Sequence, residues 1–180
     1  MYLYLTRHLS SYGEGRVLHV APEPKLERLL RERYGNRYVS LDIDPKRADV
    51  VADIIDLPFP DNEFELIICA HVLEHVPDDR RAMREFARVL TKTGTAFLLV
   101  PFSPILTESF EDASVTAPEA RETTFGQSDH VRIYGTDYVN RLEESGLTVK
   151  TLLPKAVVTP KEVSRFALDP IEPLFVCQKA

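Results

Sequence analysis

The chain has 180 residues, of which 44% are hydrophobic and 28% are charged, and its formal net charge is −6. This length fits one domain with a sizeable core, and the acidic balance argues against a large non-specific nucleic-acid surface. No stretch is long and apolar enough to cross a membrane, and no basic-then-apolar leader precedes the first predicted element. We therefore expect a cytoplasmic protein with no nucleic-acid or membrane partner, and the sequence leaves a homodimer open.

One strand–helix–strand unit is the clearest feature of the chain. The run 64–70 is short and rich in Ile and Leu, as expected of a strand that is buried on both faces. A helical stretch with Met83 and Leu90 on one face follows, with Gly94 as its predicted end. A second apolar run covers residues 95–100. A strand, a helix and a strand in direct succession are typical of a parallel βαβ unit.

Similar patterns place further elements along the rest of the chain. The predicted strands lie at residues 16–21, 38–42, 49–53, 147–153 and 174–177, and the predicted helices at 1–11, 22–34 and 137–145, the last with Thr136 as its N-cap. Strands that alternate with helices predict a doubly wound α/β domain with a mostly parallel sheet. Ligands bind such sheets outside the carboxyl ends of the strands, which here are residues 70–74 and 101–103.

The cysteines and two close histidines raise the question of a metal site. Cys69 and Cys177 both fall in apolar runs predicted to be strands, where thiols are usually reduced core residues rather than a disulfide or a metal pair. His71 and His75 lie four positions apart, but no third ligand is near them in the sequence. The sequence therefore predicts no metal ion.

Three motifs carry a family resemblance. Residues 52–67 read ADIIDLPFPDNEFELI, residues 71–76 read HVLEHV, and residues 84–94 read REFARVLTKTG. The ordered set resembles class I S-adenosylmethionine-dependent methyltransferases, whose acidic turn before the fourth strand and "RVLKPGG" motif are similar. The resemblance implies a Rossmann-like, seven-stranded sheet with an antiparallel last strand. It further implies S-adenosylmethionine as the cofactor and methylation of an oxygen or nitrogen in a small molecule.

The turn after the first predicted strand departs from the family pattern. The family has an acid and then several glycines there, because bare backbone must approach the cofactor closely. This chain has His19, Ala21, Pro22 and Glu23 at the matching places and no glycine. Ala21 is small enough for a fairly close approach, and the resemblance implies that Glu23 holds the ammonium of the cofactor's methionine part. The alternative is that the prolines only stiffen the turn and that nothing binds.

Acids at the ends of the next two predicted strands favour the cofactor. Asp42 lies at the offset where a carboxylate accepts hydrogen bonds from both ribose hydroxyls, and Ile43 follows it. The alternative for Asp42 is a cap on the next turn. The resemblance implies that Asp53 accepts a hydrogen bond from the adenine amino group. It also implies that Ile54 packs on the adenine and donates its backbone N–H.

Two segments supply candidate catalytic residues. Residues 127–135 are dense in Asp, His, Arg and Tyr and resemble a DHVRxYG segment of a bacterial subgroup of these methyltransferases. A neutral histidine can take the proton of an oxygen or nitrogen nucleophile, and His130 is the first choice. His71 is the second, because it follows Ala70 at the end of the fourth strand, where family members contact the cofactor. Arg132 completes the set, although an arginine fork in such a segment often only pins a loop.

A long insertion follows the fifth predicted strand. Residues 103–126 are polar and rich in turns, which favours a lid or a substrate-recognition segment above the pocket. Because they contain few apolar anchors, we expect them to be mobile in the free protein and ordered by ligands. The chain is thus predicted to be one domain, residues 1–180, with residues 103–135 as the lid insertion. Residues 154–173 are spaced by prolines and are a second candidate for lining the substrate pocket.

Two other functional classes stay open at this point. The first is a non-catalytic domain that binds a nucleotide or a protein partner on a decayed methyltransferase fold, which the glycine-free turn supports. The second is a nicotinamide-dependent oxidoreductase. Its glycine fingerprint is missing from this chain, and HVLEHV followed by a polar insertion does not suit it.

Overall fold

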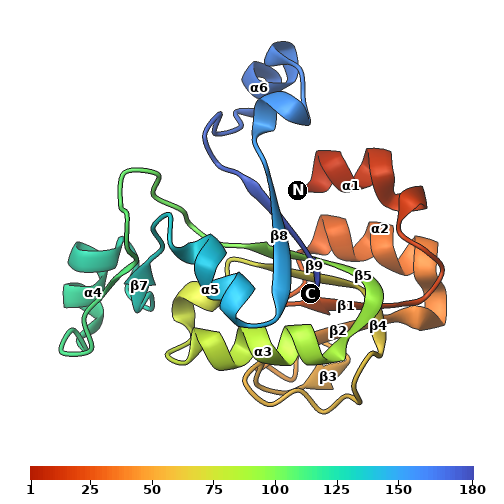
Figure 1. The fold of residues 1–180 in the computed structure, drawn as a ribbon, viewed down its shortest axis with the longest axis horizontal. Helices are drawn as coiled ribbons and strands as arrows, with labels where there is room; N and C mark the ends of the chain where they lie inside the picture. Colours follow the sequence, from red (N-terminus) through yellow and green to blue (C-terminus); the bar gives the residue numbers. More distant parts are fainter.

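The computed structural model describes residues 1–180 and has an α/β architecture (Figure 1). Seven strands form one sheet in the order β3-β2-β1-β4-β5-β9-β8. These strands are β1 (Arg16–Val20), β2 (Tyr38–Asp42), β3 (Val50–Val51), β4 (Phe64–Ala70), β5 (Leu90–Leu99), β8 (Leu147–Leu152) and β9 (Leu174–Lys179). The first five strands pair in parallel, and β9 is antiparallel to both of its neighbours. The predicted fold with an antiparallel last strand is confirmed.

Some of the helices cover the two faces of this sheet, and the others lie beside it (Figure 1). They are α1 (Tyr2–His8), α2 (Pro24–Tyr34), α3 (Asp79–Val89), α4 (Pro118–Phe125), α5 (Tyr138–Glu144) and α6 (Pro160–Phe166), with short 3-10 turns η1 (Leu9–Ser11), η2 (Gly35–Arg37), η3 (Leu73–His75) and η4 (Pro154–Ala156). Figure 1 shows α1 and α2 on one face and α3 and α5 on the other. None of the helices combines the length and the hydropathy that a membrane span requires.

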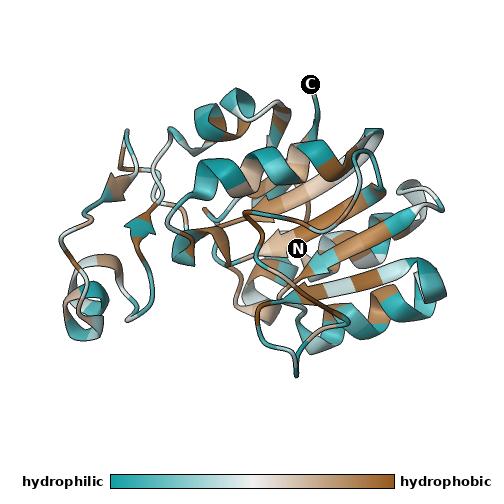
Figure 2. Cartoon of the chain, turned by 90° about the horizontal axis from the view of Figure 1, so that it is seen from below, coloured by the Kyte–Doolittle hydropathy of each residue, from teal (hydrophilic) through white to brown (hydrophobic).

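The hydrophobic core lies in two layers, because successive strand residues point to opposite faces of the sheet. In β4, Leu66 and Ile68 belong to the cluster that contains the buried leucines of α1 and α2. Ile67 and Cys69, which alternate with them, belong to the cluster that contains the apolar residues of α3 and α5. Figure 2 shows the apolar strands between helices whose outer faces are hydrophilic. Cys69 and Cys177 are both free and buried, as predicted.

Several predicted boundaries differ from the observed ones: the strand predicted at residues 49–53 covers only Val50–Val51, and two further cases have a clear cause. Gly94 does not end the helix, because α3 ends at Val89 and the fully buried Leu90 already pairs with Phe64 of β4. Gly94 lies inside β5, in the stretch where the pairing of β4 with β5 is irregular. Thr136 does not cap α5 either, since its hydroxyl donates to the carbonyl oxygen of Thr107 at 3.2 Å. In both places a contact with a segment far away in the sequence determines the structure, and the expected helix-end or N-cap role is lost.

Residues 103–135 form a small unit beside the sheet. The short strands β6 (Phe110–Glu111) and β7 (Arg132–Ile133) pair antiparallel, and α4 lies between them in the chain. Figure 1 shows this unit projecting away from the sheet, beyond α5 at the left of the view. Phe125, the last residue of α4, is buried and its ring centroid lies 5.9 Å from that of Phe110.

Candidate functional site

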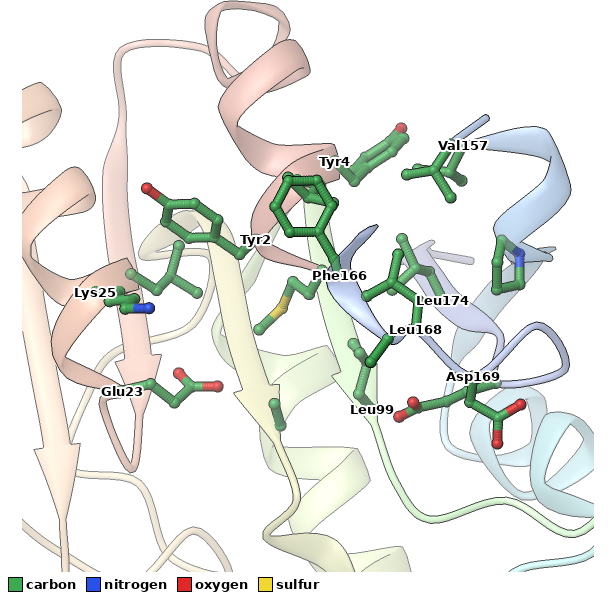
Figure 3. Close-up of a pocket in the computed structure, with 18 of the residues that line it drawn as sticks. Tyr2, Tyr4, Glu23, Lys25, Leu99, Val157, Phe166, Leu168, Asp169 and Leu174 are labelled. Carbon is green, nitrogen blue, oxygen red and sulfur yellow. The ribbon is translucent and has the colours of Figure 1, made fainter. Parts of the chain in front are cut away.

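A cavity of about 620 Å³ opens at the carboxyl ends of β4 and β5, within the usual size range of small-molecule sites. Ala70 and Leu99 form its floor, α1 and the start of α2 form one wall, and the segment between β8 and β9 forms the other (Figure 3). Its apolar lining includes Met1, Leu3, Leu26, Ala70, Leu99, Val157, Val158, Phe166, Leu168 and Leu174. The cavity therefore suits a ligand that is apolar over most of its surface.

The segment between β8 and β9 covers this cavity. Residues 154, 157, 158 and 166–169 all line it, as the spacing of the prolines indicated. A capping box between Thr159 and Glu162 begins α6. Arg7 of α1 reaches across, donates to the carbonyl oxygen of Val157 at 3.0 Å and forms an ion pair with Glu162. One arginine thus joins the two walls of the cavity.

The predicted lid is wrong as a cover for this cavity. No residue between 103 and 135 is among those that line it. The insertion is attached to α5 instead. Glu111 of β6 forms ion pairs with Arg132 at 3.3 Å and with Arg141 of α5 at 2.5 Å. These contacts fold the insertion back on α5 instead of over α1.

The turn after β1 keeps a glycine-like backbone without a glycine. Ala21 has φ +47°, in the left-handed region that non-glycine residues rarely adopt. His71, after β4, has φ +56°. Pro22 is buried. The chain therefore bends at the ends of β1 and β4 much as a glycine-containing turn would, with the Cβ of Ala21 as the added bulk.

Glu23 and His19 form one unit at this turn. His19 is fully buried, with its Nδ1 3.0 Å from the hydroxyl oxygen of Tyr38 and its Nε2 2.7 Å from a carboxylate oxygen of Glu23. Burial alone would raise the pKa of Glu23, but the hydrogen bond with His19 and the charges of His19 and His71 outweigh it and lower the pKa. Glu23 also lines the cavity (Figure 3). The structure therefore presents a carboxylate anion there.

Asp42 satisfies only one of its two carboxylate oxygens within the chain. Its Oδ1 accepts a hydrogen bond from the backbone N–H of Asp44 at 2.9 Å, so the capping alternative is correct for that oxygen. Its Oδ2 is buried and has no hydrogen-bond partner, and the nearest cation is the Nε of Arg47 at 3.6 Å. A buried acceptor without a donor is uncommon in native proteins. This orphaned oxygen fits a ligand hydroxyl, and Ile43 beside it is 75% exposed.

The two residues assigned to the adenine differ in their placement. Asp53 is exposed, and its Oδ1 accepts a hydrogen bond from the backbone N–H of Ile55 at 3.1 Å. The side chain of Ile54 is 4% exposed and belongs to the core on the α3 side, so little of its surface is left for an adenine. Burial of this apolar side chain in the core is favourable, because it removes the side chain from water. Its backbone N–H makes no hydrogen bond within the chain.

The two candidate bases do not lie together. His71 lines the cavity and is about half exposed. Its Nδ1 lies 3.6 Å from Glu74, and its Nε2 lies 3.8 Å from Glu172. Glu74, with smaller contributions from Glu172 and Glu23, raises the pKa of His71 against the opposing effect of burial. His130 is buried and does not line the cavity.

Arg132 is buried and holds backbone rather than facing the cavity. Its guanidinium donates to the carbonyl oxygens of Leu73 at 2.9 Å and Pro77 at 2.8 Å. Its Nε lies 3.8 Å from the buried carboxylate of Asp79. The structure thus places Arg132 as a pin between the insertion and η3, which is the alternative that its segment left open, and away from the cavity.

Sequence reasoning missed several polar groups of the cavity. The lining includes Tyr2, Tyr4, Lys25, Asp169 and Glu172. The first two belong to a helix that the sequence indicated only as a packing element. Their signal was weak, because tyrosines among leucines are as typical of a core face as of a ligand site.

The comparisons with known proteins agree with this architecture. Residues 3–98, more than half of the chain, match the model of the methyltransferase domain family. A curated relative, 27-O-demethylrifamycin SV methyltransferase of Amycolatopsis mediterranei, is 32% identical over 120 residues, which are 64% of this chain and 41% of that protein. Ubiquinone/menaquinone biosynthesis C-methyltransferase UbiE of Hahella chejuensis is 29% identical over 110 residues, 59% of this chain and 44% of that protein. The chain spans less than half the length of these relatives.

Solved structures share the fold across the whole chain. The YcgJ protein of Bacillus subtilis has a TM-score of 0.65 at 15% identity, with 100% of both chains covered. A putative methyltransferase solved with the Trm112 methyltransferase activator of Haloferax volcanii has a TM-score of 0.65 at 18% identity, over 99% of this chain and 89% of that one. With the match of the family model and the seven-stranded sheet, the chain belongs to the class I S-adenosylmethionine-dependent methyltransferase family.

Proposed function

We propose that this protein binds S-adenosylmethionine beyond the carboxyl ends of β1, β2 and β4 and methylates an oxygen or nitrogen of a small, mostly apolar molecule in the adjacent cavity. The observation that carries the proposal is the position of that cavity. Its lining contains Glu23, Ala70 and His71, three of the residues that the family resemblance assigns to the cofactor. The acceptor would therefore lie directly beside the reactive end of the cofactor.

Four groups would hold the cofactor. The orphaned Oδ2 of Asp42 would accept from a ribose hydroxyl, because a buried carboxylate oxygen gains most from a donor. The carboxylate of Glu23 would pair with the ammonium of the methionine part. At the adenine, the unused N–H of Ile54 would donate and the exposed Asp53 would accept. Each of these groups keeps at least one donor or acceptor atom that makes no hydrogen bond within the chain.

When bound, the cofactor supplies an electrophilic methyl group on a positively charged sulfur. The chain's own part is to hold the acceptor in line with that group and to keep water away. The apolar lining from α1 and α6 would do both. His71 is placed to take the proton that the acceptor loses, since it lies at the cavity and Glu74 and Glu172 stabilise its charged form.

The names of the relatives agree with a small acceptor. They mention 27-O-demethylrifamycin SV, ajmaline N-methylation and ubiquinone/menaquinone biosynthesis, and none mentions a nucleic acid or a protein as the acceptor. The cavity supports the same class, because its volume of about 620 Å³ suits one organic molecule of moderate size.

Calorimetric titration with S-adenosylhomocysteine tests the cofactor assignment. Asp42→Ala should weaken binding by about ten- to a hundredfold, since a hydrogen bond to a charged group contributes about 1.5–3 kcal/mol. Asp56→Ala, which removes an exposed acid of the next loop, is the matched control and should bind normally. Equal affinities of wild type and Asp42→Ala would disprove the ribose assignment.

A second titration separates the two ends of the cofactor. Glu23→Gln should weaken binding of S-adenosylhomocysteine but hardly change binding of adenosine, which has no ammonium. Equal losses for both ligands would contradict the role of Glu23.

A non-catalytic domain is the second candidate, and the alanine in the left-handed turn after β1 favours it. On that proposal wild-type protein would bind neither S-adenosylmethionine nor S-adenosylhomocysteine, and the same titration distinguishes the two. Binding of NAD in its place would favour an oxidoreductase.

A further inference from the structure

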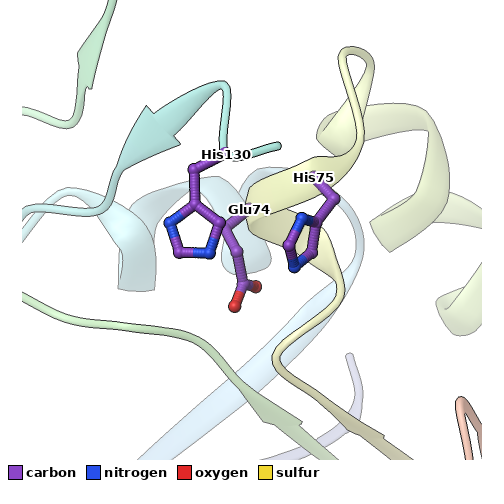
Figure 4. A group of neighbouring side chains, drawn as sticks. All are labelled: Glu74, His75 and His130. Carbon is purple, nitrogen blue, oxygen red and sulfur yellow. The ribbon is translucent and has the colours of Figure 1, made fainter. Parts of the chain in front are cut away.

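Three side chains from distant parts of the sequence meet below the insertion. Glu74 and His75 belong to η3, and His130 lies just before β7. One ligand-type atom of each lies within 4.8 Å of the others. Figure 4 shows the carboxylate of Glu74 between the two rings. The sequence offered His71 with His75 as a pair, whereas the fold brings His75 together with Glu74 and His130.

Glu74 is a buried carboxylate whose two oxygens accept no hydrogen bond within the chain. The residue is 1% exposed. The nearest group able to carry a positive charge outside the cluster is His71, whose Nδ1 lies 3.6 Å away. Removing a carboxylate from water is costly unless a cation or several donors compensate. The position of Glu74 therefore calls for a cation.

The two imidazole rings are oriented as metal ligands usually are. Nδ1 of His130 lies 3.3 Å from the carbonyl oxygen of Phe125, which can only accept, so Nδ1 carries the proton. Nδ1 of His75 lies 3.3 Å from the carboxylate of Asp129. In His130 this leaves the Nε2 lone pair free, and in His75 the neighbouring carboxylate of Asp129 favours the same arrangement. Metal-bound histidines commonly donate their other N–H to a carboxylate or a backbone carbonyl, which fixes the ring.

We propose that Glu74, His75 and His130 bind one divalent transition-metal ion of the zinc class. One carboxylate and two imidazoles form a donor set that zinc accepts, with the fourth position left for water. Tetrahedral zinc would need the ligand atoms at roughly 3.4 Å from one another, given bonds of about 2.0–2.2 Å. His75 is 31% exposed and can rotate to close the remaining distance, and its exposed partner Asp129 marks the side from which the ion enters.

The bound ion would tie the insertion to the sheet. Its ligands lie on η3, directly after β4, and at the base of β7, next to the pin formed by Arg132. It would also compensate the charge of Glu74. None of the three ligands lines the cavity, so the ion would not contact the methyl acceptor directly.

Metal binding to the chelator-treated protein tests the proposal. Titration with Zn²⁺ against a chromophoric chelator should give one equivalent bound by the wild type. His75→Ala and His130→Ala should each bind at least tenfold more weakly, and so should Glu74→Gln. Asp129→Asn should lose about ten- to a hundredfold, as is typical when the partner of a ligating histidine is removed. His8→Ala removes an exposed histidine of α1 and is the matched control, with unchanged binding.

Thermal unfolding makes the test independent of folding defects in a variant. Zn²⁺ should raise the Tm of the wild type and of His8→Ala, because a ligand that binds the native state stabilises it. It should leave the Tm of His75→Ala unchanged, and without metal that variant should unfold near the wild-type Tm, since His75 is partly exposed. Absence of a stoichiometric site in the wild type, or full affinity in His75→Ala and His130→Ala, would overturn the proposal.

Discussion

The two segments that leave the sheet near the candidate site are held in opposite ways. Residues 103–135, after β5, are polar, yet buried charges around Arg132 fix them to η3 and α5. The segment between β8 and β9 contains α6, which buries none of its residues and is joined to α1 through Arg7. The second segment, not the first, lines the cavity. Buried charges thus hold the polar insertion in place, whereas α6 is joined to α1 through a partly exposed arginine.

The largest effect should come from removing the pin of the fixed segment. Arg132→Ala should destabilise the protein by about 3–5 kcal/mol, because it leaves the buried carbonyl groups of Leu73, Val76 and Pro77 without this donor, at about 1–3 kcal/mol each. Urea unfolding measures the loss. Arg84→Ala, an exposed arginine of α3, is the control and should stay within about 0.5 kcal/mol of the wild type. A stable Arg132→Ala protein would mean that Arg132 is not a structural pin.

Arg132→Lys tests whether the positive charge of Arg132 or its planar guanidinium stabilises the protein. A lysine keeps the charge but lacks the planar fork that reaches several carbonyls at once. We expect it to recover only a small part of the lost stability, and full recovery would show that charge alone matters.

The next largest effect should come from lowering the pH, which should reduce the stability of residues 103–135. Burial would raise the pKa of Glu111 and of Asp137, but Arg141 and Arg132 lower the pKa of Glu111, and Ser109 and Arg141 lower that of Asp137. Carboxyls with lowered pKa values contribute stability that is fully present above their ordinary values of 4.5 and 3.8 and is lost as the pH falls through the lowered values. Urea unfolding at a series of pH values should show this loss, and Asp137→Asn should show less of it. An identical pH profile for the variant would contradict the assignment.

A smaller effect should appear in the segment between β8 and β9. Arg7→Ala removes a partly exposed ion pair, so we expect the stability to fall by only about 0.2–1 kcal/mol. Hydrogen exchange should nevertheless rise in residues 154–173 and remain unchanged in residues 103–135. Arg132→Ala should give the reverse pattern. Faster exchange in both segments of either variant would show that they open together.

The smallest effect is expected at the turn after β1. Ala21→Gly relieves a left-handed alanine, worth about 1–2 kcal/mol, but a glycine gives back about 0.5–1 kcal/mol of backbone entropy. Stability should therefore rise by no more than about 1 kcal/mol, while S-adenosylhomocysteine should bind equally or a few-fold more tightly, because bulk is removed from the turn. A weaker complex would show that the Cβ of Ala21 is part of the site.

Much of the fold and part of the site followed from the sequence. The short, mostly apolar runs at residues 38–42 and 64–70 predicted β2 and β4 with their observed bounds, because a strand that is buried on both faces is apolar along most of its length. The ends of the strands then placed Glu23, Asp42 and His71 at one edge of the sheet, because parallel strands end together. Local patterns were sufficient for these features.

Tertiary structure alone decided the remainder. Leu90 enters β5 because Phe64 lies beside it, and Ile54 turns inward because the core on the α3 side accepts it. Likewise, the burial of Glu74 between two histidines and the position of Arg132 depend on segments far away in the chain. The sequence records what a residue prefers, whereas the side of the molecule on which a loop lies depends on partners that only the folded chain brings together.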